Sequence, residues 1–422
     1  MNEYSRPTGG APSRVATLVV FLYGVAAPLD IIPLIGGRSV GSLAGVAAIA
    51  IAALSAEHYS DRSRPLRFAL WSGCTLLFAV AAISSLWAPP TSSSFALTVS
   101  LAYSLASFWA VATLLPSRRR TLLHGIIVGE ILLVALLFLQ GDIGENLRLS
   151  YQNVDENVTA YTLAVGIAAC IVAMREMWSF ALFGAVSAVL SGAVLLTGSR
   201  TGVAALVLVI LVAALVRVRR DRIPLDLALI ASAVGVIWFL RGLALRWDGL
   251  PDRVRPLLRG DLGSDSGRSV IRNAYMERID EWWVTGTGYY GSAHFLNTGG
   301  GGFYAFPHNT FLKLWVETGL LGVAAFGLIC LTTALIAMRS PQGMRCTPLL
   351  VPGMIFSLTL GGMEQVSLFW VSVALIVAAA LPPLRDSESP RSGSDPLSRR
   401  SSSTPARRVA AGSRASSGSL TL

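Results

Sequence analysis

Apolar stretches, each about as long as a lipid bilayer is thick, recur along the chain from Val15 to Leu381. A helix rises about 1.5 Å per residue, so roughly 20 apolar residues cross a hydrocarbon core about 30 Å thick. The composition agrees with this pattern, because 53% of the 422 residues are hydrophobic, 14% are charged and the mean hydropathy is +0.60. These values exclude an ordinary soluble enzyme, and we predict an all-α, polytopic membrane protein.

We predict about twelve transmembrane helices and one large outward-facing loop. The predicted spans are residues 15–35, 40–56, 66–87, 95–115, 122–139, 158–174, 178–196, 202–216, 225–240, 319–338, 349–360 and 366–381. The chain then divides into a cytoplasmic N-terminus (1–14), transmembrane helices 1–9 (15–240), a large periplasmic or extracellular loop (241–307), a surface helix with transmembrane helices 10–12 (308–384), and a tail (385–422). The tail is rich in Ser, Arg and Pro, so we expect it to be disordered and cytoplasmic.

Basic residues between the spans predict which side of the membrane each connection faces. They fall on alternate connections, whereas the other connections, such as 88–94 and 141–157, are neutral or acidic. The basic residues are Arg62, Arg64, Arg67, Arg118, Arg119, Arg120, Arg175, Arg217, Arg219, Arg220, Arg222, Arg339 and Arg345. Cytoplasmic loops carry an excess of such residues, so we predict an inner-membrane protein with both termini in the cytoplasm.

The large loop carries arginines although it is predicted to face outward, which long loops tolerate. They are Arg241, Arg246, Arg253, Arg255, Arg259, Arg268, Arg272 and Arg278. Two interpretations stay open. The arginines bind an anion outside the membrane, or they pair with acidic residues of the same loop, such as Asp261 and Asp265. A nucleic-acid partner is not expected, because the chain has no continuous basic face.

The sharpest local pattern is HNTFLKLWVETGLLG, which begins at His308. Asn309 or Thr310 can cap a helix at this point, and the free N–H groups of such a helix start favour an anion such as a phosphate. Gly319 and Gly322 share one face of this helix and permit the close approach of another helix. From the residues alone, His308 is either a structural cap or a catalytic group.

This pattern resembles the signature of the O-antigen ligase and polymerase family: His, Asn or a similar polar residue, nine residues, Gly, two residues and a small residue. Three further segments are similar to elements of that family. They are Thr197-Gly198-Ser199-Arg200-Thr201-Gly202, Arg268 upstream of the Gly286-Thr287-Gly288 turn, and Asn153 to Asn157 before a span. One departure is Trp283, which stands near the place of a proline in the family. All four elements lie on the outer face in the predicted topology.

The resemblance implies transfer of a glycan from an undecaprenyl-diphosphate carrier to the hydroxyl of a glycan, lipid or protein acceptor, with inversion and without a metal or cofactor. His308 would act on the acceptor hydroxyl, because histidine titrates near neutral pH. Arg200 and Arg268, with Arg272 in reserve, would bind the diphosphate, because a guanidinium offers two donors to phosphate oxygens at once. Asn309 and Tyr304 are further predicted substrate contacts, although the glycine-rich segment before Tyr304 is equally a plain connector.

Two alternatives stay open. A polymerase would use the same donor and extend the carrier-linked glycan, and the sequence does not separate it from a ligase. A transporter or flippase of lipid-linked oligosaccharides commonly has internal repeats and charges within its spans. The chain shows no such repeat, and Glu130 is its main charge within a span. The chain also has no Asp-x-Asp pair, and Asp30 is the one acidic residue that a metal-dependent alternative would use.

Overall fold

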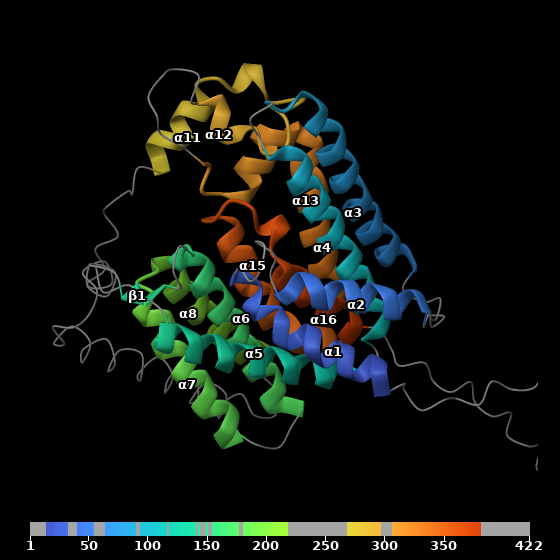
Figure 1. The fold of residues 1–422 in the computed structure, drawn as a ribbon, viewed down its shortest axis with the longest axis vertical. Coiled ribbons are helices and arrows are strands. Elements are labelled where there is room, and N and C mark those ends of the chain that lie inside the picture. The colour runs from blue at the N-terminus through green and yellow to red at the C-terminus, as the bar shows by residue number, and fades with distance from the viewer. Residues whose placement is uncertain are drawn as a thin grey trace, which may run out of the picture. The chain divides into compact units, whose positions relative to one another are not determined.

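The computed structural model describes residues 14–32, 40–54, 64–89, 93–115, 118–140, 142–143, 149–150, 154–176, 180–217, 268–296 and 306–380. Most of these residues are helical, which confirms the all-α prediction (Figure 1). Besides the helices, the described residues include one small antiparallel sheet, in which the two-residue strands β1 (Asp142–Ile143) and β2 (Leu149–Ser150) pair.

Five of the described helices are long and apolar enough to cross a membrane, judged by length and composition. They are α3 (Arg64–Ser84), α4 (Ser94–Leu114), α5 (Arg119–Gln140), α6 (Glu156–Glu176) and α13 (Thr310–Met338). Shorter apolar helices accompany them: α1 (Arg14–Ala26), α2 (Val40–Leu54), α7 (Phe180–Leu196), α8 (Arg200–Arg217) and α16 (Ser367–Ala380). The protein is therefore an integral membrane protein.

The number of twelve spans stays a prediction. The predicted span at 225–240 lies outside the described residues. The predicted span at 349–360 contains the short helix α15 (Leu350–Ser357), which follows the 3-10 turn η7 (Thr347–Leu349). The 8 residues of α15 reach only about 12 Å at the rise of an α-helix, so α15 does not cross a bilayer by itself.

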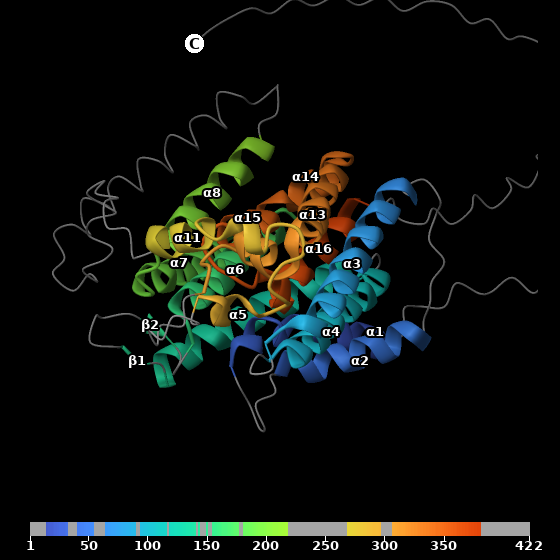
Figure 2. The same ribbon diagram turned by 90° about the horizontal axis from the view of Figure 1, so that it is seen from above.

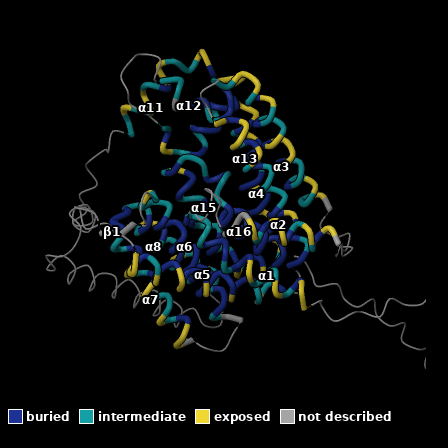
Figure 3. Tube along the Cα trace, in the orientation of Figure 1, coloured by how far each residue is buried: buried dark blue, intermediate teal, exposed yellow. Residues whose placement is uncertain are grey.

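The helix α6 lies in the interior of the described helices, where it contacts α5, α7, α8 and α16 (Figures 1 and 3). Its middle is rich in small side chains, and nearly all of residues 160–173 are buried. Small side chains allow helices to approach closely in a membrane protein. On the other side of the molecule α13 runs along α3 and also packs against α16 and α14 (Pro341–Cys346).

Three short helices of the predicted outer loop lie together near the start of α13 (Figures 1 and 2). They are α11 (Arg268–Met276), the 3-10 turn η5 (Ile279–Glu281) and α12 (Ser292–Phe295). A small buried cluster of Tyr275, Trp282 and Val316 connects them to α13. Trp282 and Trp315 also pack edge to face, with their ring centroids 5.5 Å apart.

A break in α13 fixes the loop against the helix. Gly319 has φ 68° and ψ −165°, a conformation that only glycine adopts without strain. Backbone carbonyls next to the break accept hydrogen bonds from the loop instead of from the helix: Thr287 N–H donates to Val316 O at 2.7 Å, and Gly288 N–H donates to Glu317 O at 3.0 Å. A Cβ at position 319 would lie 1.9 Å from Val284 O, so no larger residue fits there. The close neighbour of this glycine is thus the loop backbone rather than the second helix that the sequence suggested.

Candidate active site

The helix α13 begins beside His308, and Asn309 is its N-cap. The Asn309 Oδ1 atom accepts a hydrogen bond from the Leu312 N–H at 3.0 Å, which confirms the predicted cap. The amide nitrogen of the same side chain donates to Leu358 O at 3.2 Å. Both ends of the amide are therefore used within the protein, and the predicted contact of Asn309 with a substrate stays a prediction.

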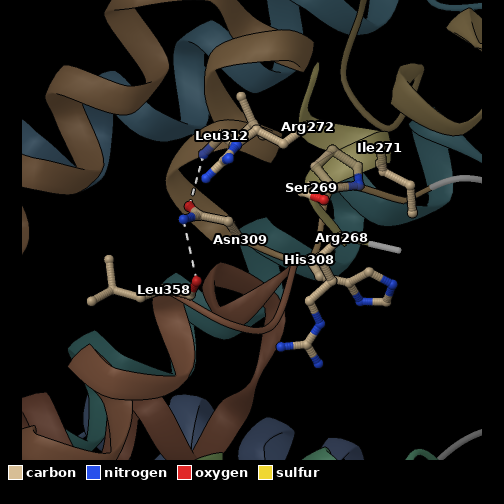
Figure 4. A pocket seen from close by; sticks show the side chains of 9 residues that line it. Arg268, Ser269, Ile271, Arg272, His308, Asn309, Leu312 and Leu358 are labelled. Atoms are coloured by element: carbon tan, nitrogen blue, oxygen red, sulfur yellow. Dashed lines mark hydrogen bonds between the residues drawn. The ribbon is translucent and has the colours of Figure 1, made fainter. Parts of the chain in front are cut away.

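A pocket of about 210 Å³ opens at this helix start (Figure 4). It is lined by Arg268, Ser269, Ile271, Arg272, Pro307, His308, Asn309, Leu312 and Leu358. One wall comes from α11 and the other from the first residues of α13, while Leu358 at the end of α15 closes the site between them. The structure thus brings Arg268, Arg272 and His308 together, although His308 is 36 to 40 residues later in the chain.

The position of the two arginines follows from the pattern of α11. Residues four apart lie on the same face of a helix, so Arg268 and Arg272 project from one side of α11. Tyr275, three residues after Arg272, lies near the same side at the other end of α11 and is fully buried in the cluster with Trp282, which donates from Nε1 to Tyr275 O at 3.1 Å. The end of α11 with Tyr275 therefore packs on the protein, and its start, with the two arginines, borders the pocket.

Neither pocket arginine has a carboxylate partner within the described ranges. Arg278, six residues further on, shows the contrast, because it forms a bidentate ion pair with Glu281 with both contacts at 2.7 Å. The alternative partners Asp261 and Asp265 lie outside the described residues. Two guanidinium groups that line one pocket, and that form no ion pair among the described residues, suit an anion with several oxygens, such as a diphosphate.

The environment of His308 favours its neutral form. The pKa of His308 is lowered from its ordinary value, first by partial desolvation and then by the positive charge of Arg268. The carboxylate of Asp155 raises the pKa by less. At neutral pH the imidazole therefore has a free nitrogen that can accept a proton. Figure 4 shows the side chains of His308 and Arg268 next to each other.

The structure places the Thr197 to Gly202 segment at the start of α8, outside the set of residues that line the pocket. Gly198 has φ 66°, which turns the chain into the helix. Ser199 Oγ accepts from the Gly202 N–H at 3.1 Å and donates to Asn157 Oδ1 at 2.8 Å. Asn157 in turn donates to Asp155 Oδ1, which caps α6. Two of the segments that resembled the family thus form one network.

The structure describes only one of the two other predicted site residues, Arg200 and Tyr304. Arg200 is the first residue of α8 and does not line the pocket, so its contact with a diphosphate stays a prediction. Tyr304 lies outside the described residues. Among the described His, Cys, Asp and Glu residues, no three lie together in a group that could hold a metal ion.

Sequence reasoning missed a buried charged cluster directly behind the pocket. Lys313 Nζ lies 2.7 Å from Glu364 Oε1 and 3.7 Å from Glu317 Oε2. A signal was present, because Lys313 is the only lysine of the chain and stands four residues before Glu317 within an apolar stretch. The pairing with Glu364, 51 residues away, has no local sequence signature.

Three comparisons with known proteins bear on this site. A family model described as O-antigen ligase matches residues 185–327, a range that includes Arg200, Arg268 and His308. No curated protein matches the chain. One solved structure, titled "Structural coordination of polymerization and crosslinking by a peptidoglycan synthase complex", is 17% identical with a TM-score of 0.42. It covers 74% of this chain and 97% of its own, and a likeness this distant carries no argument.

Proposed function

A family model described as O-antigen ligase matches residues 185–327, and from this premise we propose that the chain is a membrane glycosyltransferase of that family. It transfers a glycan from an undecaprenyl-diphosphate carrier to an acceptor hydroxyl at the outer face of the cytoplasmic membrane. A polymerase that extends the carrier-linked glycan uses the same donor and the same site, so the acceptor alone distinguishes the two reactions.

One observation carries the proposal: Arg268, Arg272 and His308 line one pocket. The pocket therefore combines two fixed positive charges with one neutral base. A transfer from a diphosphate carrier needs these two components, because negative charge accumulates on the leaving diphosphate while the acceptor hydroxyl loses a proton. A transporter that is not coupled to protons has no need of a base beside its anion site.

The proposed reaction is a single displacement. The acceptor oxygen attacks the anomeric carbon while the bond from that carbon to the diphosphate oxygen breaks, so the configuration inverts. His308 accepts the proton of the acceptor hydroxyl. Arg268 and Arg272 donate hydrogen bonds to the diphosphate oxygens as their charge increases, and the diphosphate-linked carrier leaves. In this scheme the two guanidinium groups supply the positive charge that a divalent metal ion supplies in other enzymes.

The proposed orientation rests on the basic residues between the spans. Several of these lie at helix ends on one side in the sequence-based topology, including Arg118 to Arg120 at the start of α5 and Arg339 after α13. Both termini are then cytoplasmic, and α11, α12 and the pocket face the periplasm or the exterior. An alkaline phosphatase fusion in the segment before α11 tests this orientation, since the enzyme is active only outside the cytoplasm.

The experiment that tests the function uses the purified full-length protein in liposomes. Undecaprenyl-diphosphate-linked glycan is supplied with an acceptor, and the transferred glycan and the released carrier are measured with and without EDTA. We expect both products in equal amounts and no inhibition by EDTA. Movement of the intact lipid-linked glycan across sealed vesicles, without transfer, would instead identify a transporter.

A further inference from the structure

The buried charged cluster behind the pocket has no part in the reaction described above. Lys313, Glu317 and Glu364 are 3%, 0% and 0% exposed, respectively. The ammonium of Lys313 lies between the two carboxylates, at 2.7 Å from Glu364 and 3.7 Å from Glu317. Tyr289 and Tyr290 add their ring faces, whose centroids lie 5.7 and 5.2 Å from the Lys313 Nζ atom.

Stability alone does not account for such a cluster. Removal of charges from water costs several kcal/mol per ion, and replacement of a buried ion pair by apolar residues of similar size often leaves a protein equally or more stable. The second oxygens of Glu317 and Glu364 have no hydrogen-bond partner in the part of the chain that the structure describes, which adds to the cost. A cluster of this kind is best explained by the geometry that it fixes.

The contact of Lys313 with Glu364, which we call the Glu364 arm, connects the cluster to the wall of the pocket that contains His308. Glu364 lies in the 3-10 turn η8 (Met363–Gln365), directly after the stretch that begins at Leu358. Thr310 binds the same stretch, because its hydroxyl donates to Leu360 O at 2.6 Å and accepts from the Met363 N–H at 3.2 Å. The bond from Lys313 to Glu364 therefore holds the Leu358 side of the pocket against the first turn of α13.

The contacts of Lys313 with Glu317 and of Glu317 with Ser292, which we call the Ser292 arm, connect the cluster to the wall that carries the arginines. Ser292 Oγ of α12 donates to Glu317 Oε1 at 2.6 Å. The backbone oxygen of the same residue accepts from the hydroxyl of Tyr275 at 2.7 Å. Tyr275 belongs to α11, three residues after Arg272. The sequence of contacts from Lys313 through Glu317, Ser292 and Tyr275 thus ends on the helix that presents Arg268 and Arg272.

We propose that Lys313 is the positioning centre of the pocket: through Glu364 it sets the wall of His308, and through Glu317 and Ser292 it sets the wall of the arginines. This inference rests on the proposed function, which makes one wall the acceptor side and the other the donor side. The two arms then have separable effects. A change in the Glu364 arm acts on the transfer step, and a change in the Ser292 arm acts on the binding of the donor.

The test compares Glu364→Gln with Ser292→Ala in the purified full-length protein. We expect Glu364→Gln to lower kcat by about 10-fold to 100-fold with the donor KM changed by less than about twofold, because a small misplacement of a catalytic group has effects of this size. We expect Ser292→Ala to raise the donor KM by about 10-fold with a smaller change in kcat. The double variant Lys313→Met/Glu364→Gln should show both defects.

Binding of undecaprenyl diphosphate gives a readout that does not depend on turnover. Ser292→Ala should weaken the affinity for this probe, whereas Glu364→Gln should leave it unchanged. Ser372→Ala is the matched control, because Ser372 is also buried and donates to Leu368 O at 2.9 Å within α16. If Glu364→Gln does not yield folded protein, Thr310→Val replaces it, with Thr333→Val as its control, since Thr333 is buried in the same helix.

The outcomes separate this inference from the proposed function. A wild-type protein that binds the probe but transfers no glycan contradicts the proposed function, while the binding measurements still test the Ser292 arm. Equal changes of kcat, KM and probe affinity in Glu364→Gln and Ser292→Ala would overturn the positioning role, because they would indicate only a general loss of structure. Variants that match their controls would overturn it as well.

Discussion

The side-chain amide of Asn309 donates a hydrogen bond to the backbone oxygen of Leu358 at 3.2 Å and so connects the start of α13 to the end of α15. The same side chain caps α13 through the Leu312 N–H. Two elements that are about 50 residues apart in the sequence therefore meet at one amide beside His308. This contact explains why an asparagine rather than another helix cap follows the histidine.

Substitution of Asn309 separates its two contacts. Asn309→Asp keeps the cap and loses the donor to Leu358 O, whereas Asn309→Ala loses both. We expect Asn309→Ala to lower the free energy of unfolding by about 1 kcal/mol more than Asn309→Asp, because a lost cap costs about this much. Both should reduce transfer. Thermal unfolding in detergent and the transfer assay measure the two effects, and equal stability of the two variants would argue against the cap.

Gly319→Ala should destabilise the protein strongly. A residue with a side chain pays about 1 to 3 kcal/mol in this positive-φ region, which essentially only glycine adopts, and the added Cβ would also collide with Val284 O. Gly327→Ala is the matched control, because Gly327 lies in the same helix with no atom within 4 Å of an added Cβ. The melting temperature and the yield of folded protein measure the effect. If Gly319→Ala were as stable as Gly327→Ala, the contact between the loop and the break in α13 would be refuted.

Arg268→Lys and Arg272→Lys should each lower transfer while the protein remains folded. Lysine keeps the positive charge but loses the planar pair of donors that fits phosphate oxygens. If each arginine stabilises the leaving diphosphate, kcat/KM should fall by about 30-fold to 1000-fold. Arg278→Lys is the control, since the guanidinium of Arg278 is already paired with Glu281. A mild effect at positions 268 and 272, no larger than at position 278, would show that only general electrostatics acts there.

The pH dependence of kcat/KM should report His308. Its neutral form accepts the proton, so the rate rises with pH through a pKa that lies below the ordinary value for histidine and is constant above it. Arg268→Gln removes a positive charge that lowers this pKa, so the acid limb should move to higher pH. Asp155→Asn removes a charge that raises the pKa, so the limb should move to lower pH. Shifts of the same sign in both variants would contradict the assignment.

The sequence predicted the parts of this molecule that depend on local patterns. Apolar stretches predicted the helices, and the polar residue after His308 predicted the cap of α13. The pairing of Lys313 with Glu364 and the passage of Val284 across Gly319 were not predictable, because contacts between distant segments leave no local signature. The pocket depends on both kinds of information: the resemblance to the family singled out Arg268 and His308, and only the fold shows that they line one pocket with Leu358.

The most direct test of the central claim is the rate of glycan transfer by His308→Ala, measured beside wild-type protein and His124→Ala at equal amounts of folded protein in liposomes. His124 lies in α5 and does not line the pocket, so it is the matched histidine control. We predict that His308→Ala lowers kcat by about 100-fold or more, as loss of a general base does, while the binding of undecaprenyl diphosphate persists and His124→Ala transfers glycan at the wild-type rate. Transfer by His308→Ala at a rate near that of the wild type would contradict the proposed site.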